Sequence, residues 1–162
     1  MTVLESWQTG REILSQPEIW RDWQPSLASH AKEIAAWIDA RNPDEIWLSG
    51  AGTSAFIGMA IADYVARESG RRVRDLASTD LVGVPYEFIS PDIRPLVVSF
   101  GRSGNSSESV GVMDLLDRNC PRADRLNITC NAESELAQRK GPGPGEAKTI
   151  VLPASTHDAG FA

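Results

Sequence analysis

The sequence has few of the residues that build metal sites and disulfide frameworks. It contains two cysteines, Cys120 and Cys130, and two histidines, His30 and His157. The cysteines do not form a C-x-x-C pair, and their spacing from the histidines matches no zinc motif. The sequence therefore predicts no disulfide framework and no metal centre. As a separate expectation, we assign the protein no cofactor.

Long hydrophobic runs and positive charge are also scarce. No apolar run approaches the roughly 20 residues of a membrane-spanning helix, and the start, MTVLESWQTGRE, lacks a signal-peptide core. With 16 Lys and Arg against 22 Asp and Glu, the formal net charge is −6, whereas nucleic-acid-binding domains usually carry a basic surface. We therefore expect a cytoplasmic protein that binds neither membrane nor nucleic acid. An anionic small ligand would need local dipoles that outweigh this charge.

The pattern of residues 1–43 predicts an N-terminal helical segment. Thr9 and Glu12 match a capping box. Pro17 and Pro25 occupy positions typical of the first turn of a new helix. Apolar residues recur at a helical spacing of three to four, and we expect an exposed apolar surface that contacts another subunit, with these candidates: Trp20, Trp23, Ile34, Trp37 and Ile38.

From residue 44 onward, short apolar runs alternate with helical segments. This alternation is typical of a parallel sheet covered on both faces, and the length suits one domain. We expect a three-layer α/β/α sandwich with helices over 53–69 and 106–118, and a shorter helix within 133–139. The five predicted parallel strands are 45–49, 72–77, 95–100, 125–130 and 148–152.

Two loops rich in glycine and hydroxyl residues each follow a predicted strand. They read GAGTSA (50–55) and FGRSGNSSES (100–109). Parallel sheets bind ligands beyond the carboxyl ends of their strands, and a helix N-terminus there offers free N–H groups to an anion. The loops therefore predict a phosphate site, with hydroxyl donors at Thr53, Ser54, Ser103, Ser106 and Ser107.

Other interpretations of the first loop remain open at this point. GAGTSA could be a tight turn in which Thr53 or Ser54 caps the next helix. It could also belong to a dinucleotide-binding fingerprint, which expects an acidic residue at the end of the second strand. Asp75 lies inside that predicted strand and Asp80 lies beyond it, so neither stands at the position that the fingerprint expects.

GAGTSA, SFGRSGNSSES and ITCN, each at the end of a predicted strand, together resemble the motifs of the sugar isomerase (SIS) domain. That domain pairs a G-x-G-x-S loop with an S-x-S-G-x-T/S loop around a phosphosugar. With the closing THDAGFA, the chain is most similar to the tagatose-6-phosphate ketose/aldose isomerase group, also described as galactosamine-6-phosphate deaminases. The resemblance covers residues 9–162 and implies a phosphosugar-binding domain at 44–162 with a flavodoxin-like strand order.

The resemblance also implies roles for individual residues. It assigns phosphate binding to Ser54, Ser103 and Ser106. It assigns contact with the rest of the substrate to Gly52, Thr53, Arg102, Gly104 and Asn105. Gly101 stands where many such domains carry the first serine of the second motif, so we expect a backbone N–H or Ser99 to take the place of that hydroxyl.

The activity implied by the resemblance is the conversion of an amino-sugar phosphate to a ketose phosphate. In that family the glutamate base and a ring-opening histidine lie in a second SIS half, and neither has a counterpart here. We therefore expect a phosphosugar-binding half that pairs with a second half or, alone, with its own copy. The ionisable candidates near the site are Asp80, Glu108, His157 and Asp158, of which His157 is the catalytic candidate. The alternatives are a non-catalytic phosphosugar sensor and a dinucleotide-binding oxidoreductase.

Overall fold

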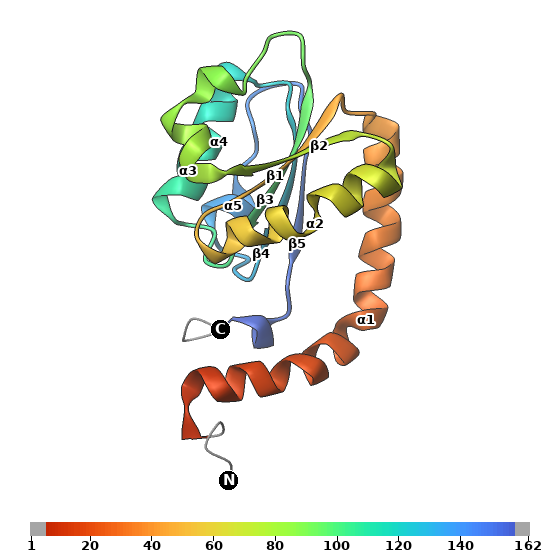
Figure 1. Cartoon of the computed structure of the whole chain (residues 1–162), viewed down its shortest axis with the longest axis vertical. Helices are drawn as coiled ribbons and strands as arrows, with labels where there is room; N and C mark the ends of the chain where they lie inside the picture. The colour runs from red at the N-terminus through yellow and green to blue at the C-terminus, as the bar shows by residue number, and fades with distance from the viewer. Residues whose placement is uncertain (1–5, 158–162) are drawn as a thin grey trace.

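A five-stranded parallel sheet forms the centre of the computed structural model, which describes residues 6–157 (Figure 1). The strand order is β2-β1-β3-β4-β5, which confirms the sandwich and the flavodoxin-like order. The strands are β1 (Glu45–Gly50), β2 (Arg72–Ala77), β3 (Pro95–Gly101), β4 (Asp124–Thr129) and β5 (Ala147–Val151). All lie within one residue of the bounds expected from sequence.

Helices cover both faces of this sheet (Figure 1). Helices α1 and α2 pack on one face, and α3 and α4 pack on the other. The helices are α1 (Gln8–Arg41), α2 (Thr53–Ser69), α3 (Ser78–Gly83), α4 (Ser107–Asn119) and α5 (Glu135–Gln138), with single 3-10 turns at Pro85–Glu87 and Ala154–Thr156. The short α3 was not expected from the sequence.

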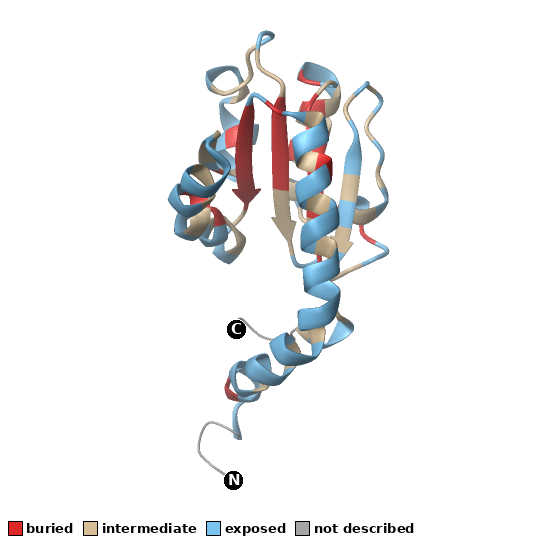
Figure 2. Cartoon of the chain, turned by 90° about the vertical axis from the view of Figure 1, so that its right-hand side faces the viewer, coloured by how far each residue is buried: buried red, intermediate tan, exposed pale blue. Residues whose placement is uncertain are grey.

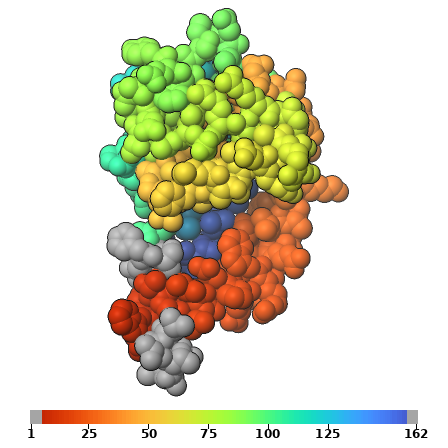
Figure 3. Space-filling view, in the orientation of Figure 1, coloured from red at the N-terminus to blue at the C-terminus, as the bar shows by residue number. Residues whose placement is uncertain are grey.

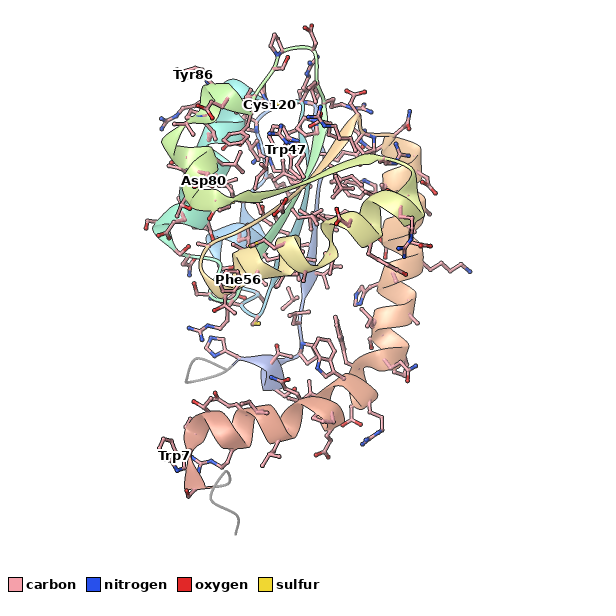
Figure 4. The ribbon with its side chains drawn as sticks, in the orientation of Figure 1. Trp7, Trp47, Phe56, Asp80, Tyr86 and Cys120 are labelled. Carbon is pink, nitrogen blue, oxygen red and sulfur yellow. The ribbon has the colours of Figure 1, made fainter. Side chains whose placement is uncertain are left out.

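The core lies on both sides of the sheet because neighbouring side chains in a strand point to opposite faces. Ile46 and Leu48 of β1 pack against α1 and α2, whereas Trp47 between them packs under α3 and α4 (Figure 4). Trp47 is only 1% exposed. The central strands are buried along much of their length (Figure 2). Their carboxyl ends lie side by side in the sheet, which brings together the loops that follow them.

The N-terminal segment differs from the expectation of several short helices. Residues Gln8–Arg41 form one helix that contains both Pro17 and Pro25. The helix bends partway along its length (Figure 1), as a proline removes one backbone donor and can kink a helix without ending it. The capping-box prediction is also wrong. The N-cap is Trp7 and makes no side-chain cap bond, so Thr9 lies inside the helix.

The last turns of α1 belong to the core. Trp37 is 9% exposed, and Ile34 and Ile38 pack against the buried cluster formed by β1, β3 and α2. The prediction that these three side chains form an exposed contact surface is therefore wrong, because the sheet itself covers them. Trp20, farther from the sheet, is 55% exposed, and Figure 3 shows the early residues of α1 reaching past the sheet domain.

Neither a membrane span nor a metal cluster is found among residues 6–157. No helix in that range combines the length and apolar character needed to cross a bilayer. No group of three or more His, Cys, Asp and Glu side chains in it is arranged to hold a metal ion.

Candidate functional site

A cavity of about 510 Å³ lies where β1 and β3 end side by side in the sheet. This is the point at which the strand order reverses, because β2 lies on one side of β1 and β3 lies on the other. Doubly wound sheets bind ligands at such a point. We name its two rims the glycine loop (50–54) and the serine loop (101–106). The lining residues are Ala51, Gly52, Thr53, Ser54, Ile57, Phe100, Gly101, Arg102, Ser103, Ser106, Glu108 and Ser109.

The glycine loop joins β1 to α2 by an abrupt turn. A Cβ atom on Gly50 would lie 2.7 Å from the backbone of Ser54, so only glycine allows this approach. Gly52 has a φ of 55°, which favours glycine, and it is itself the N-cap of α2. The helix therefore does not use Thr53 or Ser54 as its N-cap. Both line the cavity from the first turn of α2.

The serine loop joins β3 to α4, and Ser106 is the N-cap of that helix. The Ser106 hydroxyl accepts a hydrogen bond from the Ser109 N–H at 3.2 Å and donates one to the Ser109 hydroxyl at 3.1 Å. The Ser103 hydroxyl accepts a hydrogen bond from the Asn105 N–H at 3.4 Å. The cavity thus has hydroxyl groups at its serine rim and a helix N-terminus behind them. Gly101 lines the cavity, whereas Ser99 does not.

Glu108 brings a carboxylate to the same cavity from the first turn of α4. Its own backbone N–H, followed by the hydroxyl groups of Ser106 and Ser107, lowers the pKa of the Glu108 carboxyl below its usual value. The Ser107 hydroxyl donates to it at 3.3 Å. A carboxylate held in its ionised form by such donors is a weak base. Glu108 is therefore poorly suited to remove a proton from carbon.

Gly104 and Asn105, which the resemblance assigned to the substrate, do not line this cavity. They contact the segment that leads into α5 instead. The Gly104 carbonyl accepts a hydrogen bond from the Leu136 N–H at 3.1 Å, and the Asn105 side-chain oxygen accepts one from the Glu135 N–H at 2.8 Å. These two residues attach the serine loop to the N-terminus of α5.

Two of the proposed ionisable catalytic candidates lie away from the cavity. Asp80 is exposed on α3 (Figure 4), and His157 is exposed just after the turn Ala154–Thr156. Neither lines the cavity, and Asp158 lies outside the described residues. Among the candidates in residues 6–157, only Glu108 reaches it.

The cavity also has lining residues that the sequence analysis missed. Ile57 follows Thr53 by four positions and so lies on the same face of α2. Phe100 is the penultimate residue of β3. Ser109 follows Ser106 by three positions, which is the spacing at which an N-cap bond forms. Helical spacing from the known hydroxyl residues could have identified Ile57 and Ser109.

A second cavity, of about 460 Å³, lies between α1 and the C-terminal turn. Its lining includes Glu18, Asp22 and Trp23 of α1 together with Pro153 and Ser155. Among its lining residues within 6–157, the charged side chains are the carboxylates of Glu18 and Asp22, and neither the glycine loop nor the serine loop contributes to it. It does not offer an anion site.

Relatives of this chain are found among both sequences and solved structures. The AgaS protein of Streptomyces coelicolor is 38% identical over 157 residues, which is 95% of this chain and 40% of that protein. The D-galactosamine-6-phosphate deaminase AgaS of Escherichia coli O157:H7 is 37% identical over 157 residues, again 95% of this chain and 41% of that protein. The chain therefore spans about two fifths of the length of these curated relatives. No family model matches it.

Among solved structures, the tagatose-6-phosphate ketose/aldose isomerase of Escherichia coli superposes with a TM-score of 0.88 at 34% identity. The match covers 99% of this chain and 45% of that one. The glucosamine-6-phosphate deaminase of Thermotoga maritima has a TM-score of 0.70 at 21% identity, which shows a common fold. Almost the whole of the present chain thus corresponds to a part of these larger proteins.

Proposed function

Because the chain belongs to the sugar isomerase (SIS) domain family, we propose that it binds a sugar phosphate and forms the phosphate-binding half of an isomerase or deaminase. The observation that carries this proposal is the convergence of the glycine and serine loops on one cavity at the ends of β1 and β3. Each loop leads into a helix N-terminus, and each contributes hydroxyl side chains. Two such helix ends directed at one cavity favour a doubly charged group.

The phosphate would be held by Ser54 from the glycine loop and by Ser103 and Ser106 from the serine loop. A hydrogen bond to a charged group contributes about 1.5–3 kcal/mol, so a few such bonds offset a large part of the cost of association. The sugar would extend toward the wall formed by Ile57 and Phe100. Arg102 of the serine loop, which also lines the cavity, adds a positive charge to a chain whose net charge is −6.

For the substrate we propose an amino-sugar phosphate of the galactosamine 6-phosphate type, converted to a ketose phosphate of the tagatose 6-phosphate type. The names of the relatives support this choice. In the open-chain sugar, a base removes the C2 proton and C1 is reprotonated, which leaves an imine at C2. Water then hydrolyses the imine, giving the ketose phosphate and ammonia. A charged sugar phosphate does not cross a lipid bilayer unaided, so the proposal includes a cytoplasmic location.

In this scheme the present residues anchor and orient the substrate. A positioned general base contributes about 10²–10⁴-fold to such a proton transfer, and among the lining residues within 6–157 Glu108 is the only carboxylate. Its hydrogen bonds keep it a weak base. We therefore propose that a further domain or subunit supplies the base, as the 40% coverage of the relatives supports.

Calorimetry with galactosamine 6-phosphate tests the proposal. Replacing Ser103 and Ser106 together by alanine should weaken binding by about 2–5 kcal/mol, because each hydroxyl would bond to a charged group. Ser107→Ala is the matched control, since Ser107 is adjacent in sequence but does not line the cavity. Equal affinity of the wild type and the double variant would refute the phosphate assignment. A parallel NADH titration would detect dinucleotide binding instead.

A further inference from the structure

Four consecutive residues of the serine loop, 102–105, accept hydrogen bonds from one other part of the chain. That part is residues 129–136, which run from the end of β4 into α5, and we call it the clamp segment. Thr129 and Cys130 both donate to the Arg102 carbonyl, the former through its hydroxyl at 3.1 Å and the latter through its N–H at 3.2 Å. The loop is thus held by its backbone on the side toward β4.

Residues 103–105, the other three of these four, also accept hydrogen bonds from the clamp segment. The Asn131 side-chain amide donates to the Ser103 carbonyl at 3.3 Å. Beyond it, Gly104 and Asn105 accept from the first N–H groups of α5, as described above. A Cβ atom on Gly104 would lie 2.3 Å from the Ser134 hydroxyl. The loop and the clamp segment are therefore in direct contact as well as hydrogen-bonded.

The clamp segment is itself internally bonded around two residues. The Thr129 hydroxyl, which donates to the serine loop, also accepts a hydrogen bond from the Asn131 N–H at 3.2 Å. The Asn131 side-chain oxygen accepts from the Glu133 N–H at 3.0 Å, and its carbonyl accepts from the Ser134 hydroxyl at 2.7 Å. Thr129 is 1% exposed, so water cannot readily replace its bonds.

None of the clamp residues lines the cavity. We propose that Thr129 and Asn131 are positioning residues, which set the shape of the serine loop so that it can receive an oxyanion before any ligand arrives. The proposal rests on the proposed function, because it concerns the same phosphate site. A loop that is already in its bound shape loses less conformational entropy on binding. If the clamp is weakened, only part of the population has that shape, and the apparent affinity falls by the same fraction.

The chain offers a matched set of variants at and near Thr129. Thr129→Val keeps the side-chain volume but removes the hydroxyl that bonds to Arg102. Thr129→Ser keeps the hydroxyl but loses a buried methyl group, so it controls for lost stability. Thr149→Val, on the neighbouring strand β5, removes a hydroxyl that bonds to the Ala137 carbonyl of α5 at 3.2 Å and not to the serine loop itself.

Two measurements on the full chain test the proposal. Calorimetry with galactosamine 6-phosphate should show about three- to tenfold weaker binding for Thr129→Val, the equivalent of one ordinary hydrogen bond. Amide hydrogen exchange should be faster by a similar factor at residues 103–106. Thr129→Ser and Thr149→Val should match the wild type in both measurements, even where their melting temperatures fall.

The outcomes separate the two proposals. Unchanged exchange at residues 103–106 in Thr129→Val would overturn the positioning role, whatever the binding result. Faster exchange with unchanged affinity would also overturn it, because the loop shape would then not govern binding. If the wild type binds no phosphosugar but exchange in the loop accelerates in Thr129→Val alone, the proposed function fails while the control of loop shape by Thr129 stands.

Discussion

The Arg41 guanidinium lies 2.8 Å from the Asp124 carboxylate and joins the last turn of α1 to the first residue of β4. Asp124 is fully buried, whereas the Arg41 side chain is 24% exposed. The same guanidinium contacts Glu146 at 2.9 Å, and Glu146 accepts a hydrogen bond from the Trp37 indole at 3.0 Å. These contacts attach the C-terminal end of α1 to the sheet.

Arg41→Met should destabilise the protein because it leaves the Asp124 carboxylate buried without its cation. Removing one partner of a buried ion pair lowers the free energy of unfolding by about 3–5 kcal/mol. Because Arg41 is partly exposed, we expect a loss at the lower end of this range. Urea unfolding monitored by tryptophan fluorescence measures the loss. Arg67→Met, at an exposed ion pair with Glu68, should change stability little. Similar losses in both variants would contradict this prediction.

Gly104→Ala should also destabilise the protein, by about 2–5 kcal/mol. Its φ of 64° is unfavourable for alanine, and the added methyl group would overlap Ser134. Gly70→Ala isolates the first effect, because Gly70 has a φ of 66° and open space around its Cβ position. Thermal denaturation of the two variants should therefore differ, and equal losses would exclude the contact with Ser134 as a cause.

Glu108→Gln should make stability less dependent on pH in the acid range. The folded-state pKa of Glu108 is lowered, so its contribution is present above its ordinary value of 4.5 and is lost as the pH falls below that value. The variant should be less stable than the wild type at neutral pH, and the difference should shrink in acid. Denaturant unfolding at a series of pH values measures this. A difference that grows in acid would have the wrong sign.

The chain alone should bind phosphosugar without appreciable turnover. The cavity has groups for binding but lacks a strong base among its described lining residues. An assay for ammonia and ketose phosphate should therefore give no signal above background, and His157→Ala should not alter it. Turnover that is abolished by His157→Ala would show that the base is present in this chain.

We expect the isolated chain to self-associate through the early part of α1. Large apolar side chains are exposed on this part of the helix and at its N-cap, namely Trp7, Ile13, Leu14, Trp20 and Leu27, and large exposed apolar patches mark interaction sites. A twofold dimer is the commonest arrangement. Light scattering at tens of micromolar should give twice the chain mass, and Trp20→Glu should shift it toward the monomer. A monomeric wild type would refute the expectation.

Periodicity and strand-end loops were sufficient to predict the sheet and the loops at its carboxyl edge, whereas the strand order was expected from the family resemblance. These features depend on local composition, such as the apolar run of β3 followed at once by glycine and serine. The single bent α1 was not predicted, because the cost of a proline inside a helix can be offset by tertiary packing such as that of Trp37. The placement of Asn105 was not predicted either. Its partner, the Glu135 N–H, lies 30 residues away, and no local pattern encodes that contact.

The serine loop and the apolar side chains of the cavity come from different elements, which has a consequence for engineering. The serine loop is hydrogen-bonded to β4 and α5, whereas Ile57 and Phe100 reach the cavity from α2 and β3. Under the proposed function, libraries that vary only Ile57 and Phe100 should therefore change which phosphorylated metabolites bind, while binding of the phosphate group is retained. The domain could then serve as a biosensor scaffold in which the serine loop is kept constant and the side chains at positions 57 and 100 are varied.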